Sequence, residues 1–349
     1  MKKLIKPILD YAIKQEASDV HLSCGKAVTF RVSWELVIKT EAGILDEEKM
    51  EGILAVFLNN DEEKIEEFHQ HRELDMAYVN DDWTSFRVNW FYRLGQISFV
   101  LRRISSRAMT MKELHLPDSV HRFTEFKQGL LLVTGPTGSG KSTTMISILD
   151  EINKTRKEHV LTIEDPVEFI FKDDKSVFSQ RQVGTDTNGF KNALKGAMRE
   201  DPDVIMIGEM RDAETVQAAL ELAETGHLVI STLHTSSAVQ TISRLLSFFP
   251  TDSQNSVRAK LADTLMGVLS QRLIPKIGGG RMGIFEIMFM TTGIKNLIRE
   301  GSMNQIYSSI ETGSKEWMVS MKKYAEFLRD KQLVLEESYS DYFKNESDF

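Results

Sequence analysis

A glycine-rich run in the middle of the chain carries the residue types needed to bind a polyphosphate. Residues 135–143 read Gly-Pro-Thr-Gly-Ser-Gly-Lys-Ser-Thr. Glycines let backbone N–H groups turn toward phosphate oxygens, and a helix that starts at the end of such a loop adds the positive end of its dipole. Lys141 is placed to reach the β- and γ-phosphates, and the Ser142 hydroxyl is placed to bind Mg²⁺. The run therefore predicts a site for a nucleoside triphosphate. Its candidate nucleotide-binding residues are Gly135, Pro136, Thr137, Gly138, Ser139, Gly140, Lys141, Ser142 and Thr143.

Two predicted buried strands end in carboxylates that suit metal binding and hydrolysis. The apolar run 204–207 is followed by Gly208 and Glu209, and the run 160–163 is followed by Glu164. We assign Glu209 to the magnesium side, partly through a water, and Glu164 to positioning the attacking water. The alternatives are a solvated strand-end glutamate and a loop-stabilising role. Spacing alone does not separate the two carboxylates, so their roles could be exchanged.

A histidine and two arginines complete the predicted catalytic set. His234 follows the apolar run 228–233 and is placed to donate to the γ-phosphate, although a core or turn histidine is an equal interpretation. Arg87 and Arg102 lie far from the glycine-rich run. A guanidinium supplied across a domain or subunit boundary is worth roughly 10³–10⁵ in rate. The alternative is a basic sheet face that binds an acidic neighbour.

The elements around these residues predict an α/β protein. From residue 121 onward, apolar runs with helical segments between them indicate a mostly parallel sheet covered on both faces. Those runs are 130–134, 160–163, 204–207, 228–233 and 284–289. Before residue 105, helical spacing at 4–16, 46–58 and 61–69 is combined with alternating stretches that predict strands. Those stretches are 19–23, 28–33, 73–79, 84–91 and 96–104.

The change of pattern predicts a division into domains. We expect an N-terminal α/β domain at 1–105, a linker at 106–120, a nucleotide-binding domain at 121–290 and a helical C-terminal region at 291–349.

Composition narrows the class of protein. Lys and Arg number 43 against 51 Asp and Glu, and this net charge of −8 argues against a protein that coats nucleic acid. Cys24 is the only cysteine, which rules out an intrachain disulfide and a multi-cysteine zinc site and fits a reducing compartment. No apolar run approaches the roughly 20 residues of a membrane span, and the N-terminus lacks the pattern of a signal peptide. We expect a cytoplasmic protein that could dock on a membrane complex.

Together these segments resemble the secretion ATPases of the AAA+/RecA-like class, and within them the branch that retracts type IV pili. The resemblance covers nearly the whole chain. Five segments carry it: 16–23, similar to the N-terminal PAS-like domain; 135–143, the Walker A motif; 162–168, the aspartate box; 203–212, the Walker B motif; and 226–235, the histidine box.

The resemblance implies a PAS-like α/β domain followed by a RecA-like P-loop ATPase domain, with ATP and Mg²⁺ as cofactors. It implies Glu164 as catalytic base, Glu209 on the magnesium side, His234 facing the phosphates, and Arg87 and Arg102 acting between domains or subunits. It further implies a homohexamer that binds an inner-membrane platform protein of the pilus machinery and acts indirectly on pilin. Such a protein is cytoplasmic and peripherally associated with the inner membrane.

Retraction is favoured over extension by two features. Residues 292–300, Thr-Gly-Ile-Lys-Asn-Leu-Ile-Arg-Glu, resemble the C-terminal Ala-Ile-Arg-Asn-Leu-Ile-Arg-Glu signature of the retraction branch. Extension and secretion ATPases tend to carry an extra N-terminal domain and a four-cysteine metal loop, for which 349 residues and one cysteine leave no room. Three alternatives stay open: an extension or type II secretion ATPase, a non-hydrolysing accessory regulator that binds ATP, and a nucleic-acid translocase.

Overall fold

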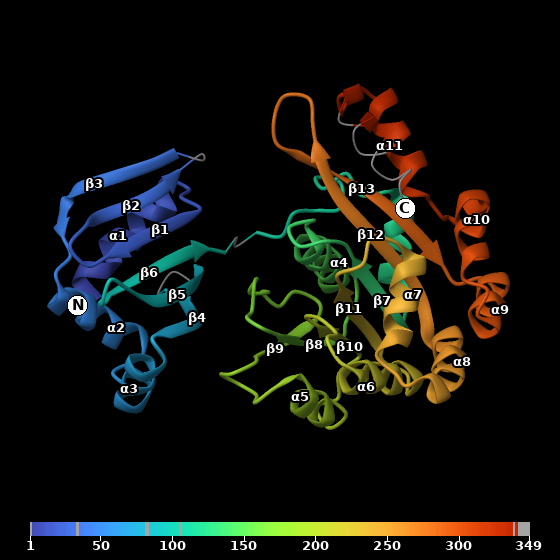
Figure 1. Cartoon of the computed structure of the whole chain (residues 1–349), viewed down its shortest axis with the longest axis horizontal. Coiled ribbons are helices and arrows are strands. Elements are labelled where there is room, and N and C mark those ends of the chain that lie inside the picture. The colour runs from blue at the N-terminus through green and yellow to red at the C-terminus, as the bar shows by residue number, and fades with distance from the viewer. Residues whose placement is uncertain (1, 33–34, 81–83, 105–106, 338, 341–349) are drawn as a thin grey trace. The chain divides into compact units, whose positions relative to one another are not determined.

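The chain divides into two compact units. The structure is a computed structural model that describes residues 2–32, 35–80, 84–104, 107–337 and 339–340 (Figure 1). The first unit comprises Met1–Arg107 with Glu168–Ile170, and the second comprises Ala108–Val167 with Phe171–Phe349. The finer limits expected for the linker and for the helical C-terminal region stay predictions.

The first unit is a six-stranded antiparallel sheet with helices on one face. The strand order is β3-β2-β1-β6-β5-β4. Its elements are α1 (Lys2–Lys14), β1 (Asp19–Ser23), β2 (Ala27–Val32), β3 (Glu35–Ile44), α2 (Glu47–Phe57), α3 (Glu62–His71), β4 (Glu73–Val79), β5 (Ser85–Arg93) and β6 (Gln96–Arg103). The three helices and five strands expected from periodicity are confirmed, while β3 was not among the strands that periodicity predicted.

The alternation of residues along these strands explains the one-sided core. Successive side chains of a strand point to opposite faces, so one set can be apolar and buried while the other stays polar. Trp90 on β5 lies opposite Phe99 on β6, and their rings stack with centroids 3.9 Å apart. Phe57 of α2 and Phe68 of α3 pack on Trp90 from the helical side. The opposite face carries the arginines discussed below.

The second unit contains a seven-stranded, mostly parallel sheet in the order β13-β12-β7-β11-β10-β8-β9. The elements are η1 (Asp118–Glu125), β7 (Gly129–Thr134), α4 (Lys141–Thr155), β8 (His159–Glu164), β9 (Val177–Gln182), α5 (Phe190–Ala197), β10 (Val204–Ile207), α6 (Ala213–Glu224), β11 (Leu228–Leu233), α7 (Ala238–Ser247), η2 (Thr251–Ser253), α8 (Gln254–Thr264), β12 (Leu265–Pro275), β13 (Arg281–Phe289), α9 (Thr292–Glu300), α10 (Asn304–Thr312), η3 (Gly313–Glu316) and α11 (Met321–Asp330). The expected α/β class and the five expected strands are confirmed; β9 and β12 were not expected.

The central strands are buried on both faces. Every residue of β7, β10 and β11 is buried, including those whose side chains point to opposite sides. Such continuous apolar runs are typical of parallel strands covered by helices on each side. The register then brings the strand ends together: Ile207 pairs with Ile163, and Leu233 pairs with Thr134. The residues that follow these strands therefore share one edge of the sheet.

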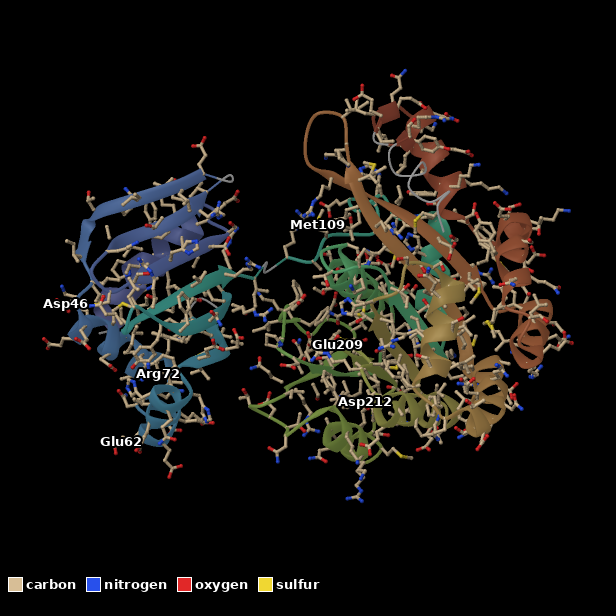
Figure 2. All side chains as sticks on the ribbon, viewed as in Figure 1. Asp46, Glu62, Arg72, Met109, Glu209 and Asp212 are labelled. Atoms are coloured by element: carbon tan, nitrogen blue, oxygen red, sulfur yellow. The ribbon has the colours of Figure 1, made fainter. Side chains whose placement is uncertain are left out.

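Helix caps define how the chain leaves this edge. Glu209 lies at the carboxyl end of β10, and Asp212 lies at the N-terminus of α6 (Figure 2). The Asp212 side chain accepts a hydrogen bond of 2.8 Å from the Thr215 amide, which satisfies a backbone donor of the first helical turn. The cap leaves only two residues between Glu209 and Asp212, which keeps Glu209 close to the strand that positions it.

Among the residues that the structure describes, none of the helices combines the length and apolar character that crossing a bilayer requires.

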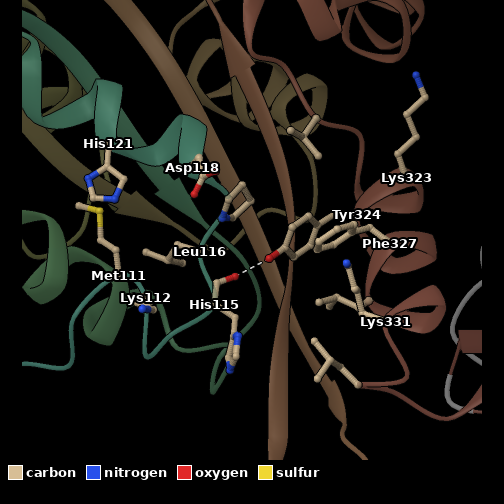
Figure 3. Close-up of a pocket in the computed structure, with 14 residues that line it drawn as sticks. Met111, Lys112, His115, Leu116, Asp118, His121, Lys323, Tyr324, Phe327 and Lys331 are labelled. Carbon is tan, nitrogen blue, oxygen red and sulfur yellow. Dashed lines mark hydrogen bonds between the residues drawn. The ribbon is translucent and has the colours of Figure 1, made fainter.

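Near the C-terminus, a tyrosine fastens α11 to the segment that precedes η1. The Tyr324 hydroxyl donates to the backbone carbonyl of His115 (Figure 3). Tyr324 is buried, and its ring makes an edge contact with Phe285 of β13. Burial, together with the nearby Asp118 carboxylate, raises the pKa of Tyr324 to about 12. The neutral phenol is therefore favoured by folding.

We expect Tyr324→Phe to lower the free energy of unfolding by about 1 kcal/mol, because the His115 carbonyl loses its donor. The pH dependence should change as well. The raised pKa means that the contribution of Tyr324 is complete below pH 10, where the unfolded chain titrates, and is lost as the pH rises through about 12. Urea denaturation at pH 8, 10 and 11 should show a steeper loss of stability in the wild type than in Tyr324→Phe. Tyr307→Phe, at an exposed tyrosine, is the control. Equal slopes in all three proteins would contradict the assignment.

Candidate nucleotide-binding site

The glycine-rich loop connects β7 to α4, as its sequence predicts. Gly135 adopts φ 151°, Gly138 φ 76° and Gly140 φ 90°, conformations that side chains disfavour. Gly140 is the N-cap residue of α4, so the amide groups of the first helical turn point back toward the loop. Pro136, Thr137 and Gly138 form the exposed tip. A glycine-rich loop that leads into a helix N-terminus in this way is suited to binding an anion such as phosphate.

Lys141 is buried at the start of α4 and folds over the loop. Its ammonium donates to the carbonyl oxygens of Gly135 at 2.8 Å and Pro136 at 3.0 Å. It also lies 3.4 Å from Nδ1 of His234, which follows β11. The cation is therefore held at the phosphate loop by carbonyl oxygens, which a phosphate group can replace.

Glu209 and His234 form a connected pair. His234 Nε2 lies 3.3 Å from one carboxylate oxygen of Glu209, and the other oxygen accepts from Arg211. A ring that accepts from Lys141 through Nδ1 carries its proton on Nε2 and can donate to Glu209. Half of the His234 side chain is exposed, with a relative accessibility of 50%. Lys141, His234, Glu209 and Arg211 thus form one chain of polar contacts.

Arg211 also belongs to this chain of polar contacts, and no role was predicted for it from the sequence. The hydrogen bond to Glu209, with the Asp165 carboxylate nearby, raises the pKa of the Arg211 guanidinium. Its only signal in the sequence is its place two residues after Glu209 in the Walker B segment.

Glu164 ends β8 and is buried beside the same edge. Its Oε1 accepts from the Thr162 hydroxyl at 2.7 Å and from the Gln180 amide at 3.3 Å. Gly208 lies alongside it: the Gly208 amide donates to the Ile163 carbonyl, and a side chain at Gly208 would come within 3.5 Å of the Glu164 Cα. The two candidate carboxylates therefore follow neighbouring strands.

The donor set at this edge fits Mg²⁺ held jointly with a nucleotide. Ser142 in the first turn of α4 and the Glu209 carboxylate offer oxygen ligands, which Mg²⁺ prefers. Within the described part of the chain, no three His, Cys, Asp or Glu side chains come together as an all-protein metal site. Mg²⁺ commonly uses one or two protein ligands with substrate phosphates and water.

A cavity of about 270 Å³ adjoins the phosphate loop. Ser139, Gly140, Thr143 and Thr144 form one wall, and residues of the β12–β13 hairpin and the segment before η1 form the others. The second group comprises Met109, Glu113, Leu114, His115, Gln271, Leu273, Lys276, Arg281, Met282, Gly283 and Phe285. None of the residues in this second group was predicted from the sequence to be part of the nucleotide site.

A larger cavity, of about 830 Å³, lies around Tyr324 between α11 and the segment before η1 (Figure 3). Its lining combines apolar side chains with three lysines, Lys112, Lys323 and Lys331, and with Asp118. No residue of the phosphate loop lines it. The larger cavity is therefore separate from the phosphate loop.

The predicted arginines lie on the first unit, on its helix-free sheet face. Arg87 of β5 and Arg102 of β6 are cross-strand neighbours, and Arg102 is itself opposite Asp19 of β1. Arg102 Nε donates to Asp19 Oδ1 at 2.8 Å, while 70% of the Arg102 side chain stays accessible. Burial alone would raise the pKa of Asp19, but hydrogen bonds from Arg102 and Ser18 outweigh it and lower that pKa. That Arg87 and Arg102 act on the bound nucleotide stays a prediction.

Comparison with known proteins agrees with this site. A family model described as type II/IV secretion system protein matches residues 1–338. The type IV pilus retraction ATPase PilT of Pseudomonas aeruginosa is 42% identical over 345 residues, 99% of each chain. A twitching motility protein of Neisseria gonorrhoeae is 40% identical over 292 residues, 83% of this chain and 78% of that one. The crystal structure of the pilus retraction motor PilT with bound ADP superposes with a TM-score of 0.88 at 40% identity, covering 96% of this chain and 95% of the other.

The loop geometry makes a prediction about two of its glycines. A Cβ at Gly135 would lie 2.3 Å from the Gln271 carbonyl oxygen and 2.5 Å from Ser139 Oγ, whereas a Cβ at Gly138 would meet nothing within 4 Å. Both substitutions carry backbone strain, of about 1–2 kcal/mol at Gly138 in the left-handed region and about 1–3 kcal/mol at Gly135 with φ 151°. Gly135→Ala should lose about 1–3 kcal/mol more of the free energy of unfolding, from overpacking. Denaturant unfolding of Gly135→Ala beside Gly138→Ala measures the difference. Equal stabilities would show that the loop does not pack against β12 as described.

Proposed function

The chain belongs to the type II/IV secretion system protein family and is one of its ATPases; on that premise we propose that it powers the retraction of type IV pili. The observation that carries the proposal is identity to a retraction ATPase at 42% over 99% of both chains. This coverage supports retraction over extension and type II secretion, because it includes both units and the C-terminal helices. The polar chain through Lys141, His234 and Glu209 supports hydrolysis over passive binding.

We infer that ATP binds with its phosphates in the loop and its nucleoside in the adjoining cavity. Loop amides and Lys141 would hold the phosphates, and Mg²⁺ bound by Ser142 and Glu209 would neutralise the charge that develops on them. Glu164, next to Glu209 along the edge, would orient the attacking water and accept its proton. Apolar side chains of Leu114, Leu273 and Phe285 in the cavity wall suit a nucleobase.

His234 would report the state of the nucleotide. Its ring lies between the Lys141 ammonium and the Glu209 carboxylate, the two groups whose partners change when a phosphate and Mg²⁺ arrive. A γ-phosphate that draws Lys141 away from the loop carbonyls would free Nδ1 of His234. The position of the ring would then differ before and after hydrolysis, as a phosphate-sensing role requires.

For the assembly, we propose a homohexameric ring that docks on an inner-membrane platform protein and acts through it on pilin, from the cytoplasmic side of the inner membrane. Arg87 and Arg102 would supply positive charge to a nucleotide across a domain or subunit boundary. Arg102 already has Asp19 as a partner, so it would be oriented, while Arg87 would be the more adaptable cation. Closure around ATP and reopening after release would supply the mechanical step.

The two carboxylates can be separated by amide substitutions that keep their shape. Glu164→Gln should keep Mg²⁺-dependent ATP binding and lose about 10²- to 10⁴-fold in kcat, because general base catalysis is removed. Glu209→Gln should weaken the Mg²⁺ dependence of ATP affinity itself. Titration of fluorescent ATP with and without Mg²⁺, beside steady-state hydrolysis, measures both. Asp150→Asn, at a carboxylate paired with Lys154 on α4, is the control. The reverse pattern would mean that the two roles are exchanged.

Deletion of the gene tests the direction of the motor. Loss of retraction should leave cells with more surface pili and no twitching, because extension continues without return of pilin to the membrane. Complementation with Lys141→Ala should fail, since the phosphates lose their ammonium partner. Cells without pili would contradict retraction and favour an extension ATPase. Complementation by Lys141→Ala would favour an accessory role without hydrolysis.

A further inference from the structure

Gln271 is a buried polar residue that touches the phosphate loop from β12. In the parallel register of β7 and β12, Ser270 lies opposite Thr134, the last residue before the loop, and their hydroxyls are 2.9 Å apart. Gln271 is the next residue, so it lies beside the point where the chain leaves β7. Its relative accessibility is 2%. A buried amide side chain is costly unless its groups are hydrogen-bonded, so its partners indicate its role.

The Gln271 amide binds the loop backbone directly. Its Nε2 donates to the Ser139 carbonyl oxygen at 2.7 Å. The peptide that joins Ser139 to Gly140 is planar and trans, so the Gly140 N–H points opposite to the Ser139 carbonyl. Holding that carbonyl against β12 therefore directs the Gly140 amide away from β12.

The contact is close enough to define the position of the loop. A Cβ at Gly135 would lie 2.3 Å from the Gln271 backbone oxygen, and a Cβ at Gly140 would lie 3.2 Å from Gln271 Nε2. The loop therefore rests on Gln271 at both its first and its last glycine. Among the described residues, no group hydrogen-bonds the buried Oε1 of Gln271. The Nε2 donor of Gln271 is therefore the group that holds the loop, whereas its Oε1 acceptor makes no hydrogen bond with the described residues.

We propose that Gln271 is a positioning residue for the phosphate-binding loop, whose amide donor orients the Gly140 N–H toward the β-phosphate of a bound nucleotide. The inference rests on the proposed ATP site. Loop amides bind phosphate well only when they converge before the ligand arrives, because an amide that must reorient subtracts from the affinity. Gln271 keeps one of these amides fixed from outside the loop, without touching the nucleotide's phosphates itself.

Two substitutions separate the donor from the acceptor. Gln271→Met has a similar length and lacks both groups, whereas Gln271→Glu keeps acceptors and lacks the donor. Leu269→Val, two residues earlier on the same strand, creates a small cavity and serves as a control for loss of stability. The readout is the preference for ADP over AMP, measured by displacement of fluorescent ADP from the full-length chain. A general structural defect weakens the binding of ADP and AMP together. A misdirected Gly140 amide weakens only the contact with the β-phosphate, which AMP lacks.

Both Gln271 variants should lose about tenfold of the preference for ADP over AMP, the factor that corresponds to about 1.4 kcal/mol, because a change in the cavity wall alters the affinity for both nucleotides alike and cancels in their ratio. Leu269→Val should keep the wild-type preference for ADP. The proposal is overturned if Gln271→Met keeps that preference, if Gln271→Glu alone retains it, or if the losses of affinity follow the melting temperature in all three variants.

Lys141→Ala in the same assay tests the ATP site separately. If the wild type itself binds no ADP, the proposed function fails; if only Gln271→Met behaves as wild type, only the role of Gln271 fails.

Discussion

The parallel register of four strands is the constraint on which the site depends. β7, β11, β10 and β8 run in one direction, so the residues after them emerge at a common edge although they are far apart in sequence. The phosphate loop, His234, Glu209 and Glu164 each follow one of these strands. A shift of one strand would separate the groups and also disturb the close packing of side chains on both faces of the sheet. The same burial that stabilises the sheet therefore fixes the chemistry at its edge.

Electrostatic balance is the second requirement at this edge. Carboxylates that follow neighbouring strands repel one another, and here each is offset locally: Glu209 by Arg211 and His234, and Glu164 by hydroxyl and amide donors. Glu209 is paired with a cation, which suits a group that exchanges one positive partner for another.

The sequence was sufficient for the groups that follow clear patterns. The glycine-rich loop and the apolar runs before Glu164, Glu209 and His234 have simple periods, and the structure places all four at one edge. It was insufficient where polar residues are buried by tertiary contacts. In β12, the run Ser270, Gln271 and Arg272 breaks the apolar pattern, so neither the strand nor the contact of Gln271 with the loop was expected. Arg211 was passed over for a similar reason, because its pairing with Glu209 depends on the turn into α6.

The same requirement for electrostatic balance applies to the arginine pair Arg87 and Arg102 on the first unit, which contains no phosphate loop. Like charges directly opposite on adjacent strands are destabilising, and Arg87 and Arg102 are directly opposite. Asp19 offsets one of them through a hydrogen bond of 2.8 Å. For Arg87, the described residues provide no ion pair within 4 Å, and its side chain is exposed on the helix-free face. A sheet face that retains such a pair has a charge that an anion would stabilise. The polyphosphate of a nucleotide is an anion of the required kind, which is why these two residues are retained in the proposed mechanism.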